Sequence, residues 1–143
     1  MALDIVAKIV AARGGDLIAE VRGGLASTVE QAAEMFGLAS TPGTYFQVKA
    51  VEAKAILTEV LSFDMAYHCE LMPRDEAERL AKSFVDSFEE DGASYYTNGE
   101  FGQPRKHPNV GPNWTPATTA TFDTGVVVLA PTRTACAWFM DED

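Results

Sequence analysis

Apolar residues recur with a helical period in two long stretches of the chain. In residues 2–13 they form one stripe that Gly14-Gly15 ends. In residues 73–90 the stripe is unbroken, and Pro73 suits a helix start. Both stretches therefore predict amphipathic helices. The stripes consist of Ile5, Val6, Ile9 and Val10 in the first, and of Ala77, Leu80, Ala81, Phe84, Val85 and Phe88 in the second.

A capping box predicts a third helix. Ser27 is followed three residues later by Glu30, so the Ser27 hydroxyl and the Glu30 carboxylate can satisfy backbone N–H groups of the first turn. Gly37 then suits the position just after a helix, and Pro42-Gly43 predicts a turn. The buried face of this helix should consist of Val29, Ala32, Ala33 and Phe36.

Residues 44–71 carry mixed signals. The segment TYFQV at residues 44–48 has the composition of a strand, whereas residues 51–61 are rich in helix formers. Residues 61–71 alternate between apolar and polar side chains, which predicts a half-buried strand. One face of that strand would carry Leu61, Phe63, Met65, Tyr67, Cys69 and Leu71, and the other Ser62, Asp64, Ala66, His68 and Glu70.

The last third of the chain predicts strands around a long loop. A strand over residues 94–97, a tight turn at Asn98-Gly99 and a long loop to residue 117 precede a hairpin over residues 119–140. Within the hairpin, residues 123–125 predict a bend or a bulge. Trp138 should face the core, whereas Phe139 should face the other side, where a second layer or a partner must cover it. Together the segments predict a single α+β domain over residues 1–143, an antiparallel sheet with a C-terminal hairpin and packed amphipathic helices.

The net charge of −10 narrows the functions that fit. Residues 1–71 carry 5 basic and 9 acidic groups and residues 72–143 carry 6 and 12, so the excess acid belongs to the whole surface. Phosphate neutralisation dominates nucleic-acid binding, so this charge disfavours a nucleic-acid partner and favours a basic one. The N-terminal segment lacks a clear signal-peptide pattern and no apolar run is long enough to span a bilayer, which predicts a cytoplasmic protein.

The cysteines and acids give no cofactor or metal pattern. Cys69 and Cys136 are far apart, without a CxxC spacing, and are expected to be free, buried thiols. Asp141, Glu142 and Asp143 supply charge at the end of the chain without the wrapped geometry that calcium needs. We therefore expect no cofactor and no metal site.

Two further functions stay open as alternatives. Residues 28–55 resemble a helix-turn-helix, although Pro42-Gly43 stands where the recognition helix should run. Asp64, His68 and Glu70 on one face of the predicted strand could converge as a catalytic set, but a solvated polar strand face is the favoured explanation.

The remaining hypothesis is a protein-binding surface. Acids cluster at Glu89-Glu90-Asp91 and at Asp141-Glu142-Asp143, where they are expected to face solvent, and Trp114 in the long loop is a possible aromatic anchor. The sequence from SYYTNG through WTPATTATFDTGVVVLAP to ACAWFMDED resembles the end of small acidic bacterial immunity proteins. The resemblance implies a non-enzymatic cytoplasmic protein that binds one cognate toxin, often a basic nuclease, and blocks its active site. It carries over no individual residues.

Overall fold

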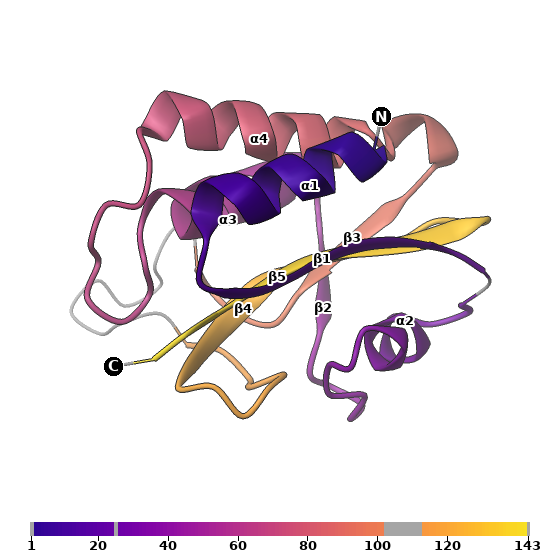
Figure 1. The fold of residues 1–143 in the computed structure, drawn as a ribbon. Helices are drawn as coiled ribbons and strands as arrows, with labels where there is room; N and C mark the ends of the chain where they lie inside the picture. The colour runs from indigo at the N-terminus through magenta and orange to yellow at the C-terminus, as the bar shows by residue number, and fades with distance from the viewer. Residues whose placement is uncertain (1, 25, 102–112, 143) are drawn as a thin grey trace.

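A five-stranded antiparallel sheet forms the centre of the part of the chain that the structure describes, residues 2–24, 26–101 and 113–142. In this computed structural model the strand order is β1-β5-β4-β3-β2 (Figure 1). The predicted α+β fold is confirmed. In chain order the elements are α1 (Ala2–Arg13), β1 (Asp16–Gly23), α2 (Val29–Met35), β2 (Phe46–Val48), α3 (Ala50–Ser62), α4 (Arg74–Asp86), the short 3-10 helix η1 (Glu89–Asp91), β3 (Ser94–Thr97), β4 (Phe122–Leu129) and β5 (Arg133–Asp141).

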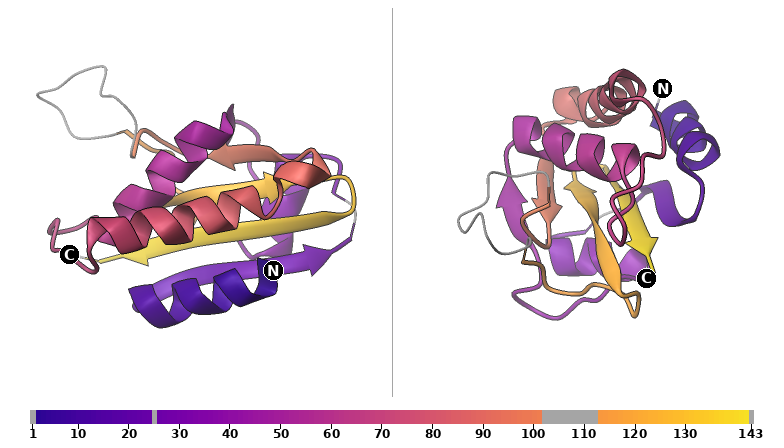
Figure 2. Two further views of the ribbon diagram at one scale, coloured as in Figure 1. Left: turned by 90° about the horizontal axis from the view of Figure 1, so that it is seen from above. Right: turned by 90° about the vertical axis from the view of Figure 1, so that its left-hand side faces the viewer.

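Helices cover both faces of the sheet. Helices α1, α3 and α4 lie over one face, and α2 lies over the other (Figures 1 and 2). Because successive residues of a strand point to opposite faces, β5 contributes to both layers. Phe139 packs with the three-helix layer and Trp138 with the α2 layer, and both side chains are fully buried. Of the two predicted covers for Phe139, a second layer or a partner, the structure shows the second layer.

The helices follow their apolar stripes closely. All six stripe residues of the segment 73–90 are buried, although α4 itself ends at Asp86 and Pro73 caps it from outside. In α1 the residues Ile5, Val6 and Ile9 are buried, whereas Val10 is 48% exposed, so the stripe is narrower than predicted.

The cap of α2 lies one residue later than predicted. Thr28 is the N-cap and its Oγ1 accepts from the backbone N–H of Gln31, while the Gln31 side chain accepts from the backbone N–H of Ser27. Thr28 and Gln31 thus play the part predicted for Ser27 and Glu30, because their side chains accept from backbone N–H groups at the start of the helix. Gly37 has φ +79°, as expected of the residue after a helix.

The hairpin of β4 and β5 pairs without interruption. Residues match one for one from Phe122 opposite Asp141 to Leu129 opposite Thr134, so the predicted bulge is wrong. Gly125 is needed there for another reason: a Cβ atom would lie 2.0 Å from the carbonyl oxygen of Ala137. The absence of a side chain at Gly125 lets the backbones of β4 and β5 approach closely, and the strand does not kink there.

The predicted strand over residues 61–71 is wrong. Helix α3 runs through Ser62, and residues 63–70 form a loop closed by an isolated bridge between Phe63 and Glu70. Leu61 is buried as a residue of α3. The alternating pattern of residues 61–71 therefore spans the end of a helix and the loop that follows it. Cys69 is exposed in this loop, contrary to the prediction, whereas Cys136 is buried as predicted.

Residues 28–55 do not form a helix-turn-helix. After α2 and the turn at Pro42-Gly43, the chain forms strand β2 before α3 begins at Ala50. Proline cannot donate a backbone hydrogen bond and glycine weakens a helix, so no recognition helix forms there. The DNA-binding alternative thereby loses the element on which it depended.

Candidate functional site

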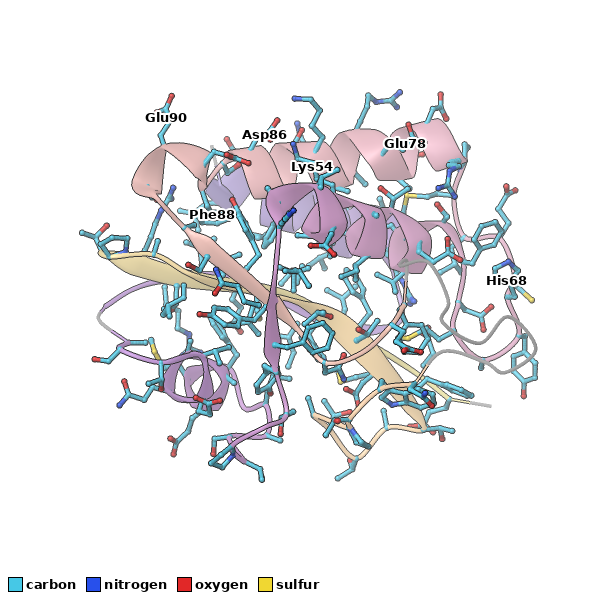
Figure 3. The ribbon with its side chains drawn as sticks, turned by 180° about the vertical axis from the view of Figure 1, so that it is seen from behind. Lys54, His68, Glu78, Asp86, Phe88 and Glu90 are labelled. Carbon is cyan, nitrogen blue, oxygen red and sulfur yellow. The ribbon has the colours of Figure 1, made fainter. Side chains whose placement is uncertain are left out.

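The structure separates the predicted binding acids into two groups at opposite ends of the sheet. The η1 end comprises η1, the C-terminal end of α4 and the β4–β5 turn. The loop end comprises residues 14–16, 63–71, 98–101, 113–121 and 141–142. Glu90 marks the first and His68 the second (Figure 3). Glu89, Glu90 and Asp91 therefore cannot act with Asp141 and Glu142 as one surface.

At the η1 end, acids alternate with basic groups. Asp91 pairs with Arg133, which also donates to the carbonyl of Ser87. Asp86 pairs with Lys54 at 2.8 Å and with Lys82 (Figure 3). These lysines lower the pKa of Asp86, chiefly through the hydrogen bond from Lys54 and then that from Lys82. Glu89 and Glu90 are exposed. A groove of about 850 Å³ lies here and is lined by Leu3, Val21, Gly23, Lys82, Ser83, Asp86, Ser87, Glu90, Asp91 and Arg133.

At the loop end, two hollows have acidic linings. One of about 420 Å³ contains Asp16 and Glu142, and one of about 330 Å³ contains Glu59 and Asp64. No lysine or arginine is among the described residues that line either hollow. Among the described residues, the linings of these two hollows are thus more uniformly acidic than the lining of the η1 groove, which includes Lys82 and Arg133. The second hollow is completed by Val60, Phe63, Met65, His68 and Phe101.

The Asp64 side chain fixes the loop over residues 63–70, which lines the second hollow. The Asp64 carboxylate accepts from the backbone N–H groups of Tyr67 and Cys69, and the Asp64 N–H donates to the Cys69 carbonyl. Such bonds stabilise turns at the expense of sheet pairing. Desolvation raises the pKa of Asp64, whereas hydrogen bonds from the N–H groups of Cys69, Tyr67 and Ala66, and then the positive charge of Arg13, lower it. The net result is a pKa below the ordinary value. Asp64 is therefore a charged acceptor at neutral pH.

The same loop presents an aromatic side chain to solvent. His68 has φ +56°, which is uncommon for a residue other than glycine, and its ring stacks on Phe63 at 4.2 Å between centroids. Tyr67 beside it is 65% exposed. Backbone outliers concentrate at functional sites because the surrounding structure must hold them in place. A tyrosine on a fixed loop is a typical interface anchor, because little conformational entropy is lost on binding.

Asp141 supports this loop from beneath. Its Oδ2 accepts from Arg13 Nη2 and from the backbone N–H of Met65, both at 2.8 Å. The predicted solvent exposure of Asp141 is therefore wrong: only 10% of its side chain is exposed. Glu142 is exposed and accepts from the N–H and hydroxyl of Thr121. Asp143 lies outside the described residues.

Trp114 lies within an aromatic cluster at the loop end. Its ring is half-buried between Phe101 and Phe122, with centroid distances of 5.3 and 5.4 Å. It pairs across an isolated bridge with Gly99, where a tight turn was predicted. The tight turn is therefore wrong, because residues 98–100 pair with residues 113–115. Within the described residues no hydrogen-bond partner faces the Trp114 Nε1.

A buried carboxylate fixes the other loops at this end. Asp123 is fully buried and accepts from Asn98 Nδ2, Trp138 Nε1 and the backbone N–H of Ala117. It also accepts from the N–H and hydroxyl of Thr118. A buried carboxylate is tolerated only when its oxygens are satisfied, as they are here. Asp123 thus determines how the segment before β4 returns to the sheet.

The catalytic alternative has little geometric support. Asp64, His68 and Glu70 lie in the loop and not on one face of a strand, and Asp64 is engaged by backbone N–H groups. Among the described residues no group of three or more histidine, cysteine or acidic side chains could hold a metal ion. No helix in the described part of the chain is long and apolar enough to span a membrane.

Comparison with known proteins gives no further guide to function. The chain matches no family model, no curated protein and no solved structure at a significant level. The candidate site therefore depends on geometry alone. Tyr67 could not be recognised from the sequence as a binding residue, because the alternating pattern assigns it to the apolar face of a strand. The available signal was Asp64, whose side chain can form a turn with the residues that follow it.

Proposed function

We propose that this protein is an inhibitor of the immunity-protein kind that binds a basic partner domain through its loop end. The observation that carries the proposal is the pair of hollows lined by acids without lysine or arginine among their described residues, together with Tyr67, which is exposed in the loop that lines the second hollow. Acidic charge speeds encounter with a basic partner, and an aromatic side chain that becomes buried on binding supplies affinity.

The overall charge and the resemblance of the last third support the same function. A net charge of −10 suits a basic partner such as a nuclease toxin domain, whose active site must itself attract phosphate. Inhibition then requires no catalysis by this chain: occluding the partner's active site is sufficient. Such an inhibitor acts in the cytoplasm of the cell that makes the toxin.

Of the residues first proposed for binding, the structure leaves some better suited than others. Asp91 and Asp141 are engaged by Arg133 and Arg13, so their charges are already compensated. Glu142 remains exposed at the loop end. We add Tyr67 and Glu70, which are both exposed in the fixed loop. Glu89 and Glu90 become the comparison set at the η1 end.

Affinity capture from the native cell, or with the products of neighbouring genes co-expressed, tests the proposal. The expected result is one basic partner in stoichiometric amount, recovered less well at higher salt because screening weakens charge complementarity. Mass spectrometry identifies the partner, and an assay of its activity shows whether binding inhibits it. Failure to recover any partner at low or moderate salt would remove the support for an inhibitor.

Paired variants then locate the surface. Tyr67→Ala with Glu70→Lys alters the loop end, and Glu89→Lys with Glu90→Lys alters the η1 end by a larger change in charge. The side chains of all four residues are exposed, and the bridge of Glu70 to Phe63 involves only the backbone. Both variants should therefore fold. Loss of capture in the first variant alone supports the loop end. Loss in the second alone assigns binding to the η1 end and contradicts the proposed surface.

A further inference from the structure

Arginines of this chain repeatedly occupy one kind of environment. In three of them, Arg13, Arg22 and Arg133, the guanidinium lies over a phenylalanine ring, 4.6–5.5 Å from its centroid, and pairs with a carboxylate. An aromatic face and a carboxylate suit a guanidinium because it is planar, charged and a fork of N–H donors. The three sets are Arg13 with Phe139 and Asp141, Arg22 with Phe36 and Glu20, and Arg133 with Phe88 and Asp91.

The smaller hollow at the loop end has the same components but no arginine among its described lining residues. Phe63 and Phe101 supply aromatic surface, and Glu59 and Asp64 supply carboxylates. Its volume of about 330 Å³ is enough for one long side chain. Hydrogen bonds from backbone N–H groups fix Asp64 in place, so its charge needs no reorganisation when a cation arrives.

We infer that this hollow binds a guanidinium group, namely an arginine side chain of the protein partner. The inference depends on the proposed function, because it names the kind of partner residue that the loop end recognises. In the sequence Tyr67 lies between Met65 and His68, which both line the hollow. One docking event would therefore engage both Tyr67 and the hollow. The hollow would then supply specificity, since an arginine that fails to enter it leaves the carboxylates unpaired.

Two arginines among the described residues lie near this hollow. Arg13 donates to the carbonyl of Val60 behind the lining and is held by Asp141, while its charge also acts on Asp64. Arg74 competes weakly for the hollow. Arg74 Nη1 lies 3.8 Å from Glu59 Oε2, beyond hydrogen-bond distance, and the Arg74 side chain is 60% exposed. It also pairs with Glu78 at 3.4 Å. A long and exposed ion pair contributes little, so Glu59 can exchange Arg74 for an incoming guanidinium at small cost. Removing Arg74 should therefore strengthen binding to the hollow.

A small probe tests the hollow without any partner. The full chain is titrated with ethylguanidinium chloride at millimolar concentrations and followed by ¹H–¹⁵N spectra, with propylammonium chloride at equal ionic strength as the comparison. We expect saturable shifts at Asp64, Met65 and His68 that are larger for ethylguanidinium. Glu59→Gln and Asp64→Asn should each weaken binding at least about threefold, because one charged partner is lost.

Matched variants make the outcome decisive. Glu90→Gln removes one carboxylate from the η1 groove and should leave the titration unchanged, whereas Arg74→Gln should tighten it. Glu59→Gln leaves the backbone bonds of the loop intact, so it decides the result if Asp64→Asn disturbs the turn. Shifts that do not saturate, or that persist in both carboxylate variants, overturn the inference. Probe binding can fail while partner capture still depends on Tyr67 and Glu70; in that case the proposed function stands alone.

Discussion

Each end of the sheet joins an arginine to an aspartate over a phenylalanine ring, but the two pairs differ in burial. At the loop end the side chains of Arg13 and Asp141 are 3% and 10% exposed. At the η1 end those of Arg133 and Asp91 are 30% and 28% exposed. The first pair joins residues 128 positions apart and the second joins residues 42 positions apart. Similar contacts thus lie in different dielectric environments.

The difference in burial should determine what each pair contributes. A buried pair requires both partners, because either charge left alone in a poorly solvated place is costly. A half-exposed pair is screened by water and salt and contributes little. Arg13 also donates to the Val60 carbonyl, and Asp141 accepts from Met65, so the buried pair connects α1, α3, β5 and the loop over residues 63–70. The pair at the loop end should therefore be the one that maintains the candidate site.

Breaking the buried pair should have the largest effect. Arg13→Met leaves Asp141 nearly buried without its cation, and we expect a loss of about 3–5 kcal/mol in the free energy of unfolding. Urea unfolding at neutral pH measures the loss. Hydrogen exchange at Met65, Tyr67 and Cys69 should also speed up, because the loop loses its support. A loss of less than about 1 kcal/mol would show that the pair resembles a surface one.

The double variant separates pairing from packing. In Arg13→Met with Asp141→Asn, the asparagine oxygen can still accept from Met65 while no unpaired charge remains. The combined loss should be smaller than the sum of the two single losses, by about 0.5–3 kcal/mol, because the residues are in contact. Additive losses would mean that Arg13 acts through its packing on Phe139 alone.

The equivalent change at the η1 end should cost less. Arg133→Met keeps an apolar stem over Phe88 but removes the partner of Asp91 and the donor to the Ser87 carbonyl. We expect a loss of about 1–2 kcal/mol, since both side chains are partly solvated. Urea unfolding again measures it, with Arg22→Met as a control that removes a fully surface pair. A loss equal to that of Arg13→Met would contradict the role assigned to burial.

Salt should distinguish the two ends more finely. Raising ionic strength from about 0.05 M to about 1 M shortens the screening length from above 10 Å to about 3 Å. The stability cost of Arg133→Met should shrink under these conditions, whereas that of Arg13→Met should change little, because a buried pair is shielded from ions. Unfolding free energies of the two variants and the parent chain at both salt concentrations measure the effect. Equal salt dependence at both ends would show that Arg13 is solvated.

Much of the fold could be predicted because its signals are local. The apolar stripe of α4, the apolar runs of β4 and β5 and the helix-forming composition of α3 each lie within one element. The loop over residues 63–70 was misassigned because its alternation fits a strand. What decides its structure is the Asp64 carboxylate and the contact of Met65 with Asp141, which lies 76 residues away.

The candidate site was harder to predict than the fold for the same reason. An excess of acidic groups can be predicted from the sequence, since charge is a property of composition. Whether a given acid is available depends on which cation the fold brings to it. Asp141 meets Arg13 only after β5 pairs with β1, and Asp91 meets Arg133 only after the η1 end is assembled. Tyr67 became a candidate only when the structure placed it outside the core.

Removing the charge of Asp86 should have the smallest of the predicted effects on stability. The direction of its pH dependence follows from the pKa of Asp86. The hydrogen bonds from Lys54 and Lys82 hold the pKa of Asp86 in the folded state below its value of about 3.9 in an unfolded chain. A depressed pKa contributes stability above the unfolded value and loses it as the pH falls through the folded value. Asp86→Asn should therefore cost less than about 1 kcal/mol at neutral pH, because the side chain is 34% exposed, and nothing once the pH lies well below the folded-state pKa. Unfolding curves of both proteins across this range test it: a cost that persists in acid would mean that Asp86 acts through its shape and not its charge.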